Sequence, residues 1–393
     1  MSRRVVGAEH VEAARARGRK VLEILPGDIV TLMAHETAAR LGMALVDGPL
    51  AAPTPHRTDG ATSSSRVLYR RSSRWSAPRQ SERREAKRLV KLALVGAGGV
   101  GGNIAHLAAN QDIADEIALI DIAPGLAAAT ALDLNHASGV TRTRSRVTGS
   151  EDLNDVAGAD VIVVTAGRAR TPGMSRADLI DVNRRVIRSA AEAIRTQAPE
   201  AIVIVVTNPL DEMTVEMLQA TAFPRERVIG MAGTLDSSRF RHALARAADV
   251  PVAAVEAITL GSHGDEMAPI TSLAQIKGRA LTAFLSEEQI DACANDAVTG
   301  GGQVVALKKI GSATIAPAHA SVELIDHIRG ARTGSVPASV MLDGEYGLTG
   351  VVLGAPCHLG PKGLVAVEEL RLTAEEMVAL HKAAEAIRAR LAT

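Results

Sequence analysis

The sequence predicts an α/β fold in which a doubly wound parallel sheet is covered by helices and followed by a second, α+β domain. Apolar residues make up 47% of the 393 residues and aromatic residues only 2%, so the core must consist mainly of Val, Ile, Leu and Ala. From residue 89 onward, short runs of these residues alternate with longer stretches of helical character. Such alternation is typical of β-α-β units, whose strands are buried on both faces.

Composition and charge predict four segments along the chain. We expect a small N-terminal extension module at 1–50, a basic linker rich in Ser, Pro and Arg at 51–88, a nucleotide-binding domain at 89–230 and a catalytic domain at 231–393. The formal net charge is zero, yet basic residues outnumber acidic ones by 17 to 9 in the first two segments and are outnumbered by 27 to 35 in the rest. This asymmetry indicates two parts with different roles.

The extension module carries signals for two helices and a strand. We expect a helix over 9–17 ended by Gly18, a strand over 20–25, and a second helix that runs from the N-cap Thr31 to residue 41. Acidic residues are scattered through the module, and no apolar stretch precedes a cleavage site. Both observations argue against a targeting peptide.

The linker is expected to be a solvated tether, because it has few apolar residues and ten basic against three acidic ones. Nucleic-acid binding is the alternative, but no groove-reading motif supports a specific nucleic-acid partner. No apolar run in the chain reaches the roughly 18 residues of a membrane span. The two cysteines, Cys293 and Cys357, fit a reducing compartment such as the cytoplasm, and no cysteine or histidine cluster indicates a metal site.

A nucleotide-binding motif opens the third segment. A strand at 92–95 leads into a Gly-x-Gly-x-x-Gly pattern formed by Gly96, Ala97, Gly98, Gly99, Val100 and Gly101. A helix over 103–110 and a strand over 117–120 follow, and Asp121 ends that strand. In a Rossmann fold such glycines let the backbone approach a pyrophosphate, and the acid accepts hydrogen bonds from the adenosine ribose. Because its carboxylate would repel the additional phosphate of NADP, NAD is the expected cofactor. The alternative is a glycine-rich turn in which Asp121 caps the next helix.

Further elements of both kinds follow. Strands are expected at 160–165, 201–206 and 228–230, with a helix over 178–197 between the first two. In the last segment we expect short strands near residue 263 and helices at 235–248, 286–307, 314–329 and 374–391.

Five residues predict proton chemistry on a small dianion. His263 can exchange a proton near neutral pH, and the carboxylate of Asp236 can orient it. Arg170, Arg176 and Arg239 can bind carboxylates through their guanidinium forks.

From about residue 89 to the C-terminus, the chain resembles the lactate/malate dehydrogenase superfamily, and within it the malate dehydrogenases of the lactate-dehydrogenase-like type. The resemblance rests on five separated motifs, at 96–101, 166–176, 206–209, 235–240 and 261–269. It implies that His263 is the acid/base that takes the C2 hydroxyl proton and that Asp236 fixes its tautomer. It also implies substrate contacts from Arg170, Arg176, Asn208, Arg239 and Ser312, and cofactor contacts from Asn183, Val206, Thr207 and Asn208. The family's Asn-Pro bond is commonly cis, so a cis bond is expected between Asn208 and Pro209.

Several of these residues have simpler structural interpretations. Asp236 and Arg239 are three residues apart on a helix and could form an ordinary surface pair. Asn208 could start the next helix, and Ser312 could be a helix cap.

Arg170 indicates the substrate. The resemblance implies a glutamine at this place in lactate dehydrogenases, whereas a cation would pair with the distal carboxylate of oxaloacetate. We therefore expect an NAD-dependent malate dehydrogenase. A lactate or broader 2-hydroxy acid dehydrogenase is the alternative of the same class, and a non-catalytic NAD-binding sensor or scaffold is that of another class. Arg168 and Thr171 depart from the family pattern in the loop that is expected to close over the substrate as a lid. Their effects on lid closure and on substrate selectivity are not predicted by the resemblance.

Short motifs in residues 11–42 resemble N-terminal extensions of bacterial microcompartment proteins. This resemblance implies recruitment of a cytoplasmic enzyme to a shell or enzyme partner. The dehydrogenase resemblance implies a homo-oligomer, either a dimer or a tetramer.

Overall fold

The computed structural model describes residues 5–25, 28–47, 86–168, 176–309 and 311–392. The chain divides into two compact units, Met1–Arg71 and Ser72–Thr393.

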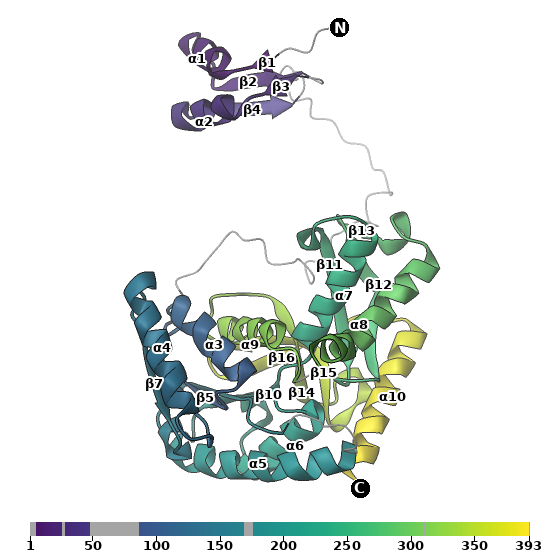
Figure 1. Ribbon diagram of the computed structural model, residues 1–393. Helices are drawn as coiled ribbons and strands as arrows, with labels where there is room; N and C mark the ends of the chain where they lie inside the picture. Colours follow the sequence, from purple (N-terminus) through teal and green to yellow (C-terminus); the bar gives the residue numbers. More distant parts are fainter. Residues whose placement is uncertain (1–4, 26–27, 48–85, 169–175, 310, 393) are drawn as a thin grey trace, which may run out of the picture. The chain divides into compact units, whose positions relative to one another are not determined.

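The N-terminal unit consists of two successive β-α-β halves (Figure 1). The first contains β1 (Val5–Val6), α1 (Ala8–Ala16) and β2 (Val21–Ile24), and the second β3 (Ile29–Val30), α2 (Leu32–Leu41) and β4 (Ala44–Asp47). Strand β1 pairs in parallel with β3, and β2 pairs in parallel with β4. As predicted, Thr31 caps α2 by accepting a hydrogen bond from Ala34 N at 3.2 Å, and Gly42 ends this helix with a φ of 62°. The short strands β1 and β3 were not predicted, because two residues are too few to show the alternation of apolar and polar side chains that indicates a strand.

The second unit begins with six parallel strands in the order β7-β6-β5-β8-β9-β10. They are β5 (Leu89–Val95), β6 (Ala114–Ile120), β7 (Arg146–Ser150), β8 (Val161–Val164), β9 (Ile202–Val205) and β10 (Val228–Gly230). The helices that connect them are α3 (Gly99–Asn110), α4 (Leu126–Thr141), α5 (Arg176–Gln197) and α6 (Leu210–Thr221). This is the strand order of a doubly wound dinucleotide-binding sheet, which confirms the predicted fold class.

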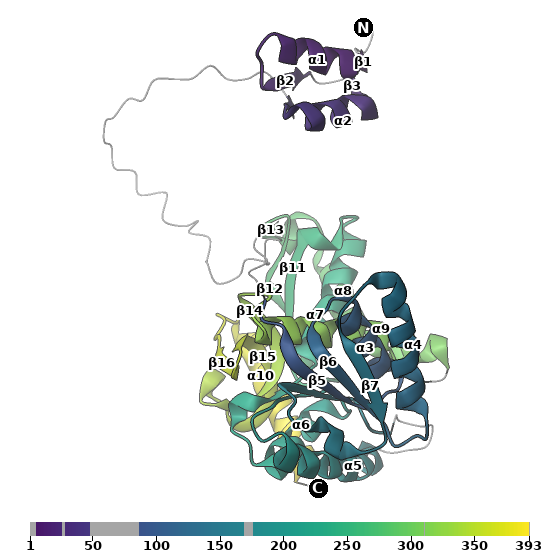
Figure 2. The same ribbon diagram turned by 90° about the vertical axis from the view of Figure 1, so that its left-hand side faces the viewer.

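The alternation of side chains along the strands separates two apolar cores. Leu92 and Leu94 of β5 belong to the core beneath α3 and α4, whereas Ala93 and Val95 belong to the core beneath α5 and α6. Successive residues of a strand point to opposite faces, so one short apolar run serves both cores. Figure 2 shows α3 and α4 on one side of these strands and α5 and α6 on the other.

The sheet continues into the second half of this unit. Strand β10 pairs antiparallel with β14 (Ser335–Asp343), and beyond it lie β15 (Thr349–Gly360), β11 (Val255–Gly261), β12 (Met267–Ile276) and β13 (Arg279–Ala280), while β16 (Gly363–Val367) pairs with β15. The helices of this half are α7 (Gly233–Ala247), α8 (Glu287–Lys308), α9 (Ile315–Ile328) and α10 (Ala374–Leu391). All four helices were predicted to within about two residues, whereas β14, β15 and β16 were missed. Pro337, Gly354 and Pro356 lie within β14 and β15, and in the sequence they resemble turn signals.

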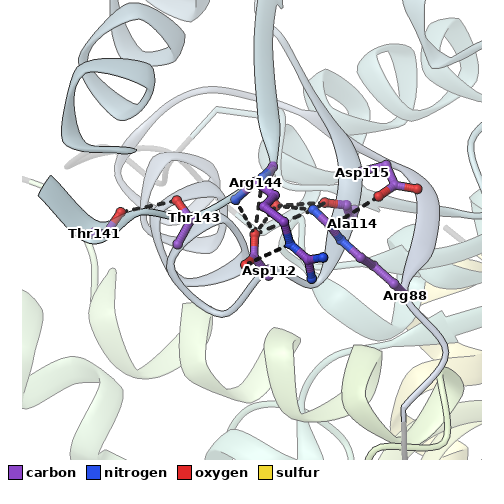
Figure 3. Close-up of polar contacts among 8 residues, drawn as sticks. Arg88, Asp112, Ala114, Asp115, Thr141, Thr143 and Arg144 are labelled. Atoms are coloured by element: carbon purple, nitrogen blue, oxygen red, sulfur yellow. Dashed lines mark hydrogen bonds and ion pairs between the residues drawn. The ribbon is translucent and has the colours of Figure 1, made fainter. Parts of the chain in front are cut away.

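Ion pairs and hydrogen bonds connect the strands at their amino ends (Figure 3). Arg88 contacts Asp115 at 3.1 Å and Asp112 at 3.4 Å, while Asp112 Oδ1 accepts hydrogen bonds from Arg144 N at 2.7 Å and Ser145 N at 3.1 Å. Burial opposes ionisation of Asp112, but the two main-chain donors and the charges of Arg88 and Arg144 outweigh it, so its pKa is lowered. Lys87 N also donates a hydrogen bond to Arg329 O at 3.1 Å. The last residues of the predicted linker therefore belong to the second unit.

Candidate active site

A cavity of about 1190 Å³ lies at the carboxyl ends of the parallel strands. The nucleotide-binding half contributes residues that follow β5, β6 and β9, and the second half contributes residues from α7, α8 and the loop after β11. The predicted residues that line it are Gly96, Gly98, Gly99, Val100, Asp121, Val206, Thr207, Asn208, Arg239, His263 and Ser312.

The glycine motif fits the approach of a phosphate group. A Cβ on Gly101 would lie 1.8 Å from Gly96 O, so the first turn of α3 packs directly against the end of β5. Gly98 faces the cavity, and a Cβ there would meet nothing within 4 Å. Helix α3 begins at Gly99 rather than at residue 103 as expected, because glycines of the motif form its first turn. The N–H groups of that turn are thus available to an anion.

Asp121 both holds the turn and faces the cavity. One carboxylate oxygen accepts a hydrogen bond from Ala97 N at 2.7 Å, and the other accepts one from Ala123 N at 2.9 Å. Asp121 does not cap the next helix, as the alternative supposed, because the N-cap of α4 is Gly125. Each carboxylate oxygen still has a second lone pair for a ribose hydroxyl. Ala97 and Gly101 shape the turn without lining the cavity.

His263, which lines the cavity, forms a hydrogen-bonded pair with Asp236. His263 follows β11, and Asp236 lies in the first turn of α7. The distance between His263 Nδ1 and Asp236 Oδ2 is 2.8 Å, and Asp236 is only 2% exposed. Because Nδ1 is occupied, Nε2 is the nitrogen that remains for a substrate proton.

The surroundings of His263 favour its protonated form. Burial disfavours the imidazolium, but the charge and hydrogen bond of Asp236, with the charge of Asp211, outweigh burial and the nearby Arg239. The pKa of His263 is therefore raised above its ordinary value.

Arg239 extends the pair into a group of three. Its Nη1 donates to Asp236 Oδ1 at 2.9 Å, and its side chain is 19% exposed. Because Arg239 lines the cavity and Asp236 is buried behind it, they do not form the surface pair considered as an alternative. Helix α8 approaches closely, since a Cβ on Gly301 would lie 3.3 Å from Arg239 Nη2. The sequence prediction missed this contact, although three successive glycines inside a predicted helix are a signal of close packing.

Asn208 and Asn183 join two loops at the edge of the cavity. Asn208 lines the cavity and precedes a cis bond to Pro209, as predicted, and Pro209 rather than Asn208 is the N-cap of α6. Asn183 does not line the cavity. Its side chain donates to Asn208 O at 2.6 Å and accepts from Arg168 N at 2.7 Å, so it fixes the start of the arginine-bearing loop. Thr207 Oγ1 donates to Ala166 O at 2.6 Å.

Ser312 is exposed and lines the cavity. The N-cap position of α9 is occupied by Thr314, so Ser312 does not cap that helix. Arg170 lies outside the described residues, and Arg176 is described only as the first residue of α5.

Among the residues that the structure describes, no group of three or more His, Cys, Asp or Glu side chains could hold a metal ion. Within the same ranges, no helix is long and apolar enough to cross a membrane.

Two family models cover the second unit almost completely. Residues 90–230 match the NAD-binding domain of lactate/malate dehydrogenase, and residues 233–393 match its α/β C-terminal domain. The malate dehydrogenase of Roseiflexus sp. (strain RS-1) is 41% identical over 302 residues, which is 77% of this chain and 97% of that protein. The malate dehydrogenase of Sorangium cellulosum (strain So ce56) is 43% identical over 299 residues, covering 76% and 95% of the two chains.

Solved structures give the same result. A malate dehydrogenase of Cryptosporidium parvum superposes with a TM-score of 0.75 at 34% identity, covering 78% of this chain and 98% of that one. A lactate dehydrogenase of the same organism, complexed with lactic acid and NAD, has the same TM-score, identity and coverage. The likeness in fold therefore does not separate the two substrates. From residue 90 to the C-terminus, the chain belongs to the lactate/malate dehydrogenase family.

Proposed function

We propose that this NAD-dependent dehydrogenase interconverts malate and oxaloacetate. The observation that carries the proposal is that His263 and Arg239, both bonded to the buried Asp236, line a cavity that Gly96, Gly98, Gly99 and Asp121 also line. Relatives about 40% identical over three quarters of the chain are named malate dehydrogenases, which favours malate over lactate.

His263 accepts the proton in malate oxidation. The C2 hydroxyl proton moves to Nε2 as the C2 hydrogen leaves with its electron pair, so the C2 carbon becomes the carbonyl of oxaloacetate. Asp236 holds Nδ1 and stabilises the imidazolium. Bound NAD supplies the acceptor for the hydride at its nicotinamide C4.

Arginines orient the substrate. Arg239 binds the C1 carboxylate, and Asn208 contacts the C2 oxygen together with Arg176. Arg170 pairs with the distal carboxylate, which lactate lacks. A charge-assisted pair in a closed site contributes on the order of 10²-fold discrimination.

Gly98, Gly99 and the first turn of α3 would hold the pyrophosphate of NAD, and Asp121 would bind the adenosine ribose. Val206, which lines the cavity, would contact the cofactor near its nicotinamide, and Ser312 would contact the substrate. Asn183 acts indirectly by holding the loops on which Asn208 and Arg168 lie.

Steady-state kinetics of the purified protein tests the substrate. We expect kcat/KM for oxaloacetate with NADH to exceed that for pyruvate by about 10²-fold or more, and Arg170→Gln to reduce this ratio at least tenfold. A wild-type preference for pyruvate would replace malate by lactate as the substrate. If Arg170→Gln leaves the ratio unchanged, Arg170 does not determine substrate specificity. Inactivity of the wild type on both substrates would favour an NAD-binding sensor or scaffold.

Residues 1–50 are proposed to recruit the enzyme to a partner in the cytoplasm. The candidate partner is a shell protein or an enzyme of a bacterial microcompartment. A role separate from catalysis is supported because these residues fall within a compact unit of their own and because both family models begin after them. Assembly of the catalytic unit into a homo-oligomer is proposed by analogy with the family.

A further inference from the structure

His263 lies in a short loop that also contains glycine. This loop connects β11 to β12: Gly261, the last residue of β11, has a φ of 85°, and Gly264 within the loop has a φ of 157°. Glycine at such angles makes a tight loop possible but gives the unfolded loop the largest conformational freedom. Contacts from outside the loop must therefore hold the imidazole against Asp236.

Asp211 supplies such a contact from behind the histidine. This residue lies in the first turn of α6 and is 1% exposed. Its Oδ2 accepts a hydrogen bond from the main-chain N–H of His263 at 2.7 Å, and its Oδ1 accepts one from the hydroxyl of Ser339 on β14 at 3.0 Å. The carboxylate thus ties the loop to both α6 and the central sheet.

An ion-pair network surrounds the same loop. Glu212, next to Asp211 and 2% exposed, pairs with Arg390 of α10 at 2.5 Å. Arg390 also donates to Ser262 Oγ at 3.2 Å and contacts Glu266 at 3.1 Å. Arg390 thus lies beside Glu212, whose negative charge disfavours ionisation of the neighbouring Asp211.

The electrostatics of Asp211 and His263 are coupled. Burial raises the pKa of Asp211 to about 6, with a further contribution from Glu212, against the lowering effects of His263 and Ser339. Burial lowers the pKa of His263, and Asp236 raises it by charge and hydrogen bond. The negative charge of ionised Asp211 raises this pKa further.

We propose that Asp211 is a positioning residue for His263: it holds the loop through the main-chain N–H and supports the imidazolium through its charge. The part of this inference that concerns turnover rests on the proposed function. The charged and titratable groups around Asp211 are His263 of the loop, Glu212 of α6 and, through Glu212, Arg390 of α10, while Asp236 and Arg239 of α7 face His263.

Asp211→Asn tests the proposal, because it preserves the size and an acceptor while removing the charge. Histidine-labelled protein is titrated by NMR, with the His263 resonance identified by its loss in His263→Asn. We expect the pKa of His263 to fall by about half a unit or more. The limb of kcat/KM for oxaloacetate reduction that falls with rising pH should move to lower pH by the same amount, because reduction consumes the imidazolium. Retention of the wild-type pKa by the folded variant would overturn the proposal.

Glu216→Gln is the matched control. Glu216 is a buried acid of the same helix, 7% exposed, that pairs with Arg184 and Arg188 rather than with the loop. It should alter thermal stability without moving the His263 titration, and an equal shift in this control would also count against Asp211. If Asp211→Asn does not fold, Ser339→Ala replaces it and should lower the pKa of His263 by a smaller amount, whereas no change would overturn the proposal. Since the NMR titration needs no turnover, it remains decisive even if the wild type reduces no oxaloacetate.

Discussion

Single residues of the active site obtain their chemical properties from neighbours that are distant in sequence. His263 is held at Nδ1 by Asp236 of α7 and at its main-chain N–H by Asp211 of α6. Both carboxylates favour the imidazolium, and together with the hydrogen bond they overcome the effect of burial. An exposed histidine in the same sequence motif would titrate near the ordinary value of about 6.5.

His263→Asn should lower kcat by roughly 10²–10⁴-fold while NADH still binds, because the variant loses the proton donor but not the cofactor half of the cavity. NADH binding is measured by fluorescence titration and kcat by NADH oxidation. Near-normal turnover would contradict the assigned role.

The pH dependence of the wild type follows from the raised pKa of His263. Oxaloacetate reduction needs the imidazolium, so kcat/KM should remain high at pH values above the ordinary histidine pKa of 6.5 and fall only as the pH rises through the raised value. Malate oxidation needs neutral His263 and should rise over the same range. A reduction limb centred below the ordinary value would show that the carboxylates do not support the charge.

At the scale of elements, helix α8 illustrates a local preference that gives way to the site. Glycines 300–302 lie inside this helix, where each is about 1 kcal/mol less favourable than alanine. For Gly300 and Gly301 the cause lies in packing, since a Cβ on either would lie 3.3 Å from the side chain of Arg239, whereas a Cβ on Gly302 would meet nothing within 4 Å.

Gly301→Ala should therefore raise KM for oxaloacetate severalfold while leaving Kd for NADH unchanged, because the added methyl group displaces the guanidinium of Arg239. The control is Gly139→Ala in α4, where a Cβ would meet nothing within 4 Å. Both variants should gain up to about 1 kcal/mol from helix propensity, partly offset by strain in Gly301→Ala. Equal KM values in both variants would mean that the close approach of α8 has no bearing on substrate binding.

At the scale of the molecule, the pairing of β10 with β14 joins the two halves of the second unit into one sheet. The cavity takes its glycines and Asp121 from one half and His263 and Arg239 from the other. Neither half alone contains the complete site.

Removal of residues 1–85 should leave kcat and KM for oxaloacetate within about twofold of the full chain, because the site lies in the second unit. Truncation must stop before Lys87 and Arg88, whose contacts belong to that unit. The same truncation tests recruitment, since partner co-localisation in cells should be lost while turnover persists. Loss of turnover in a folded truncated protein would contradict this division of roles.

The fold class, most of the helices and many of the residues that line the cavity could be predicted from the sequence, because their signals are local, whereas α4 and α6 were not predicted. Apolar strands, the glycines at 96–101, caps such as Thr31 and the spacing of Asp236 and Arg239 depend on neighbours within a few turns of chain. Only the tertiary structure showed that Asp211 reaches His263 across 52 residues of sequence, that Asn183 joins two loops, and that the glycines of α8 make room for Arg239. Such contacts depend on how α6, α7 and α8 pack around the sheet. Because no periodicity or spacing in the sequence encodes these long-range distances, packing alone decided them.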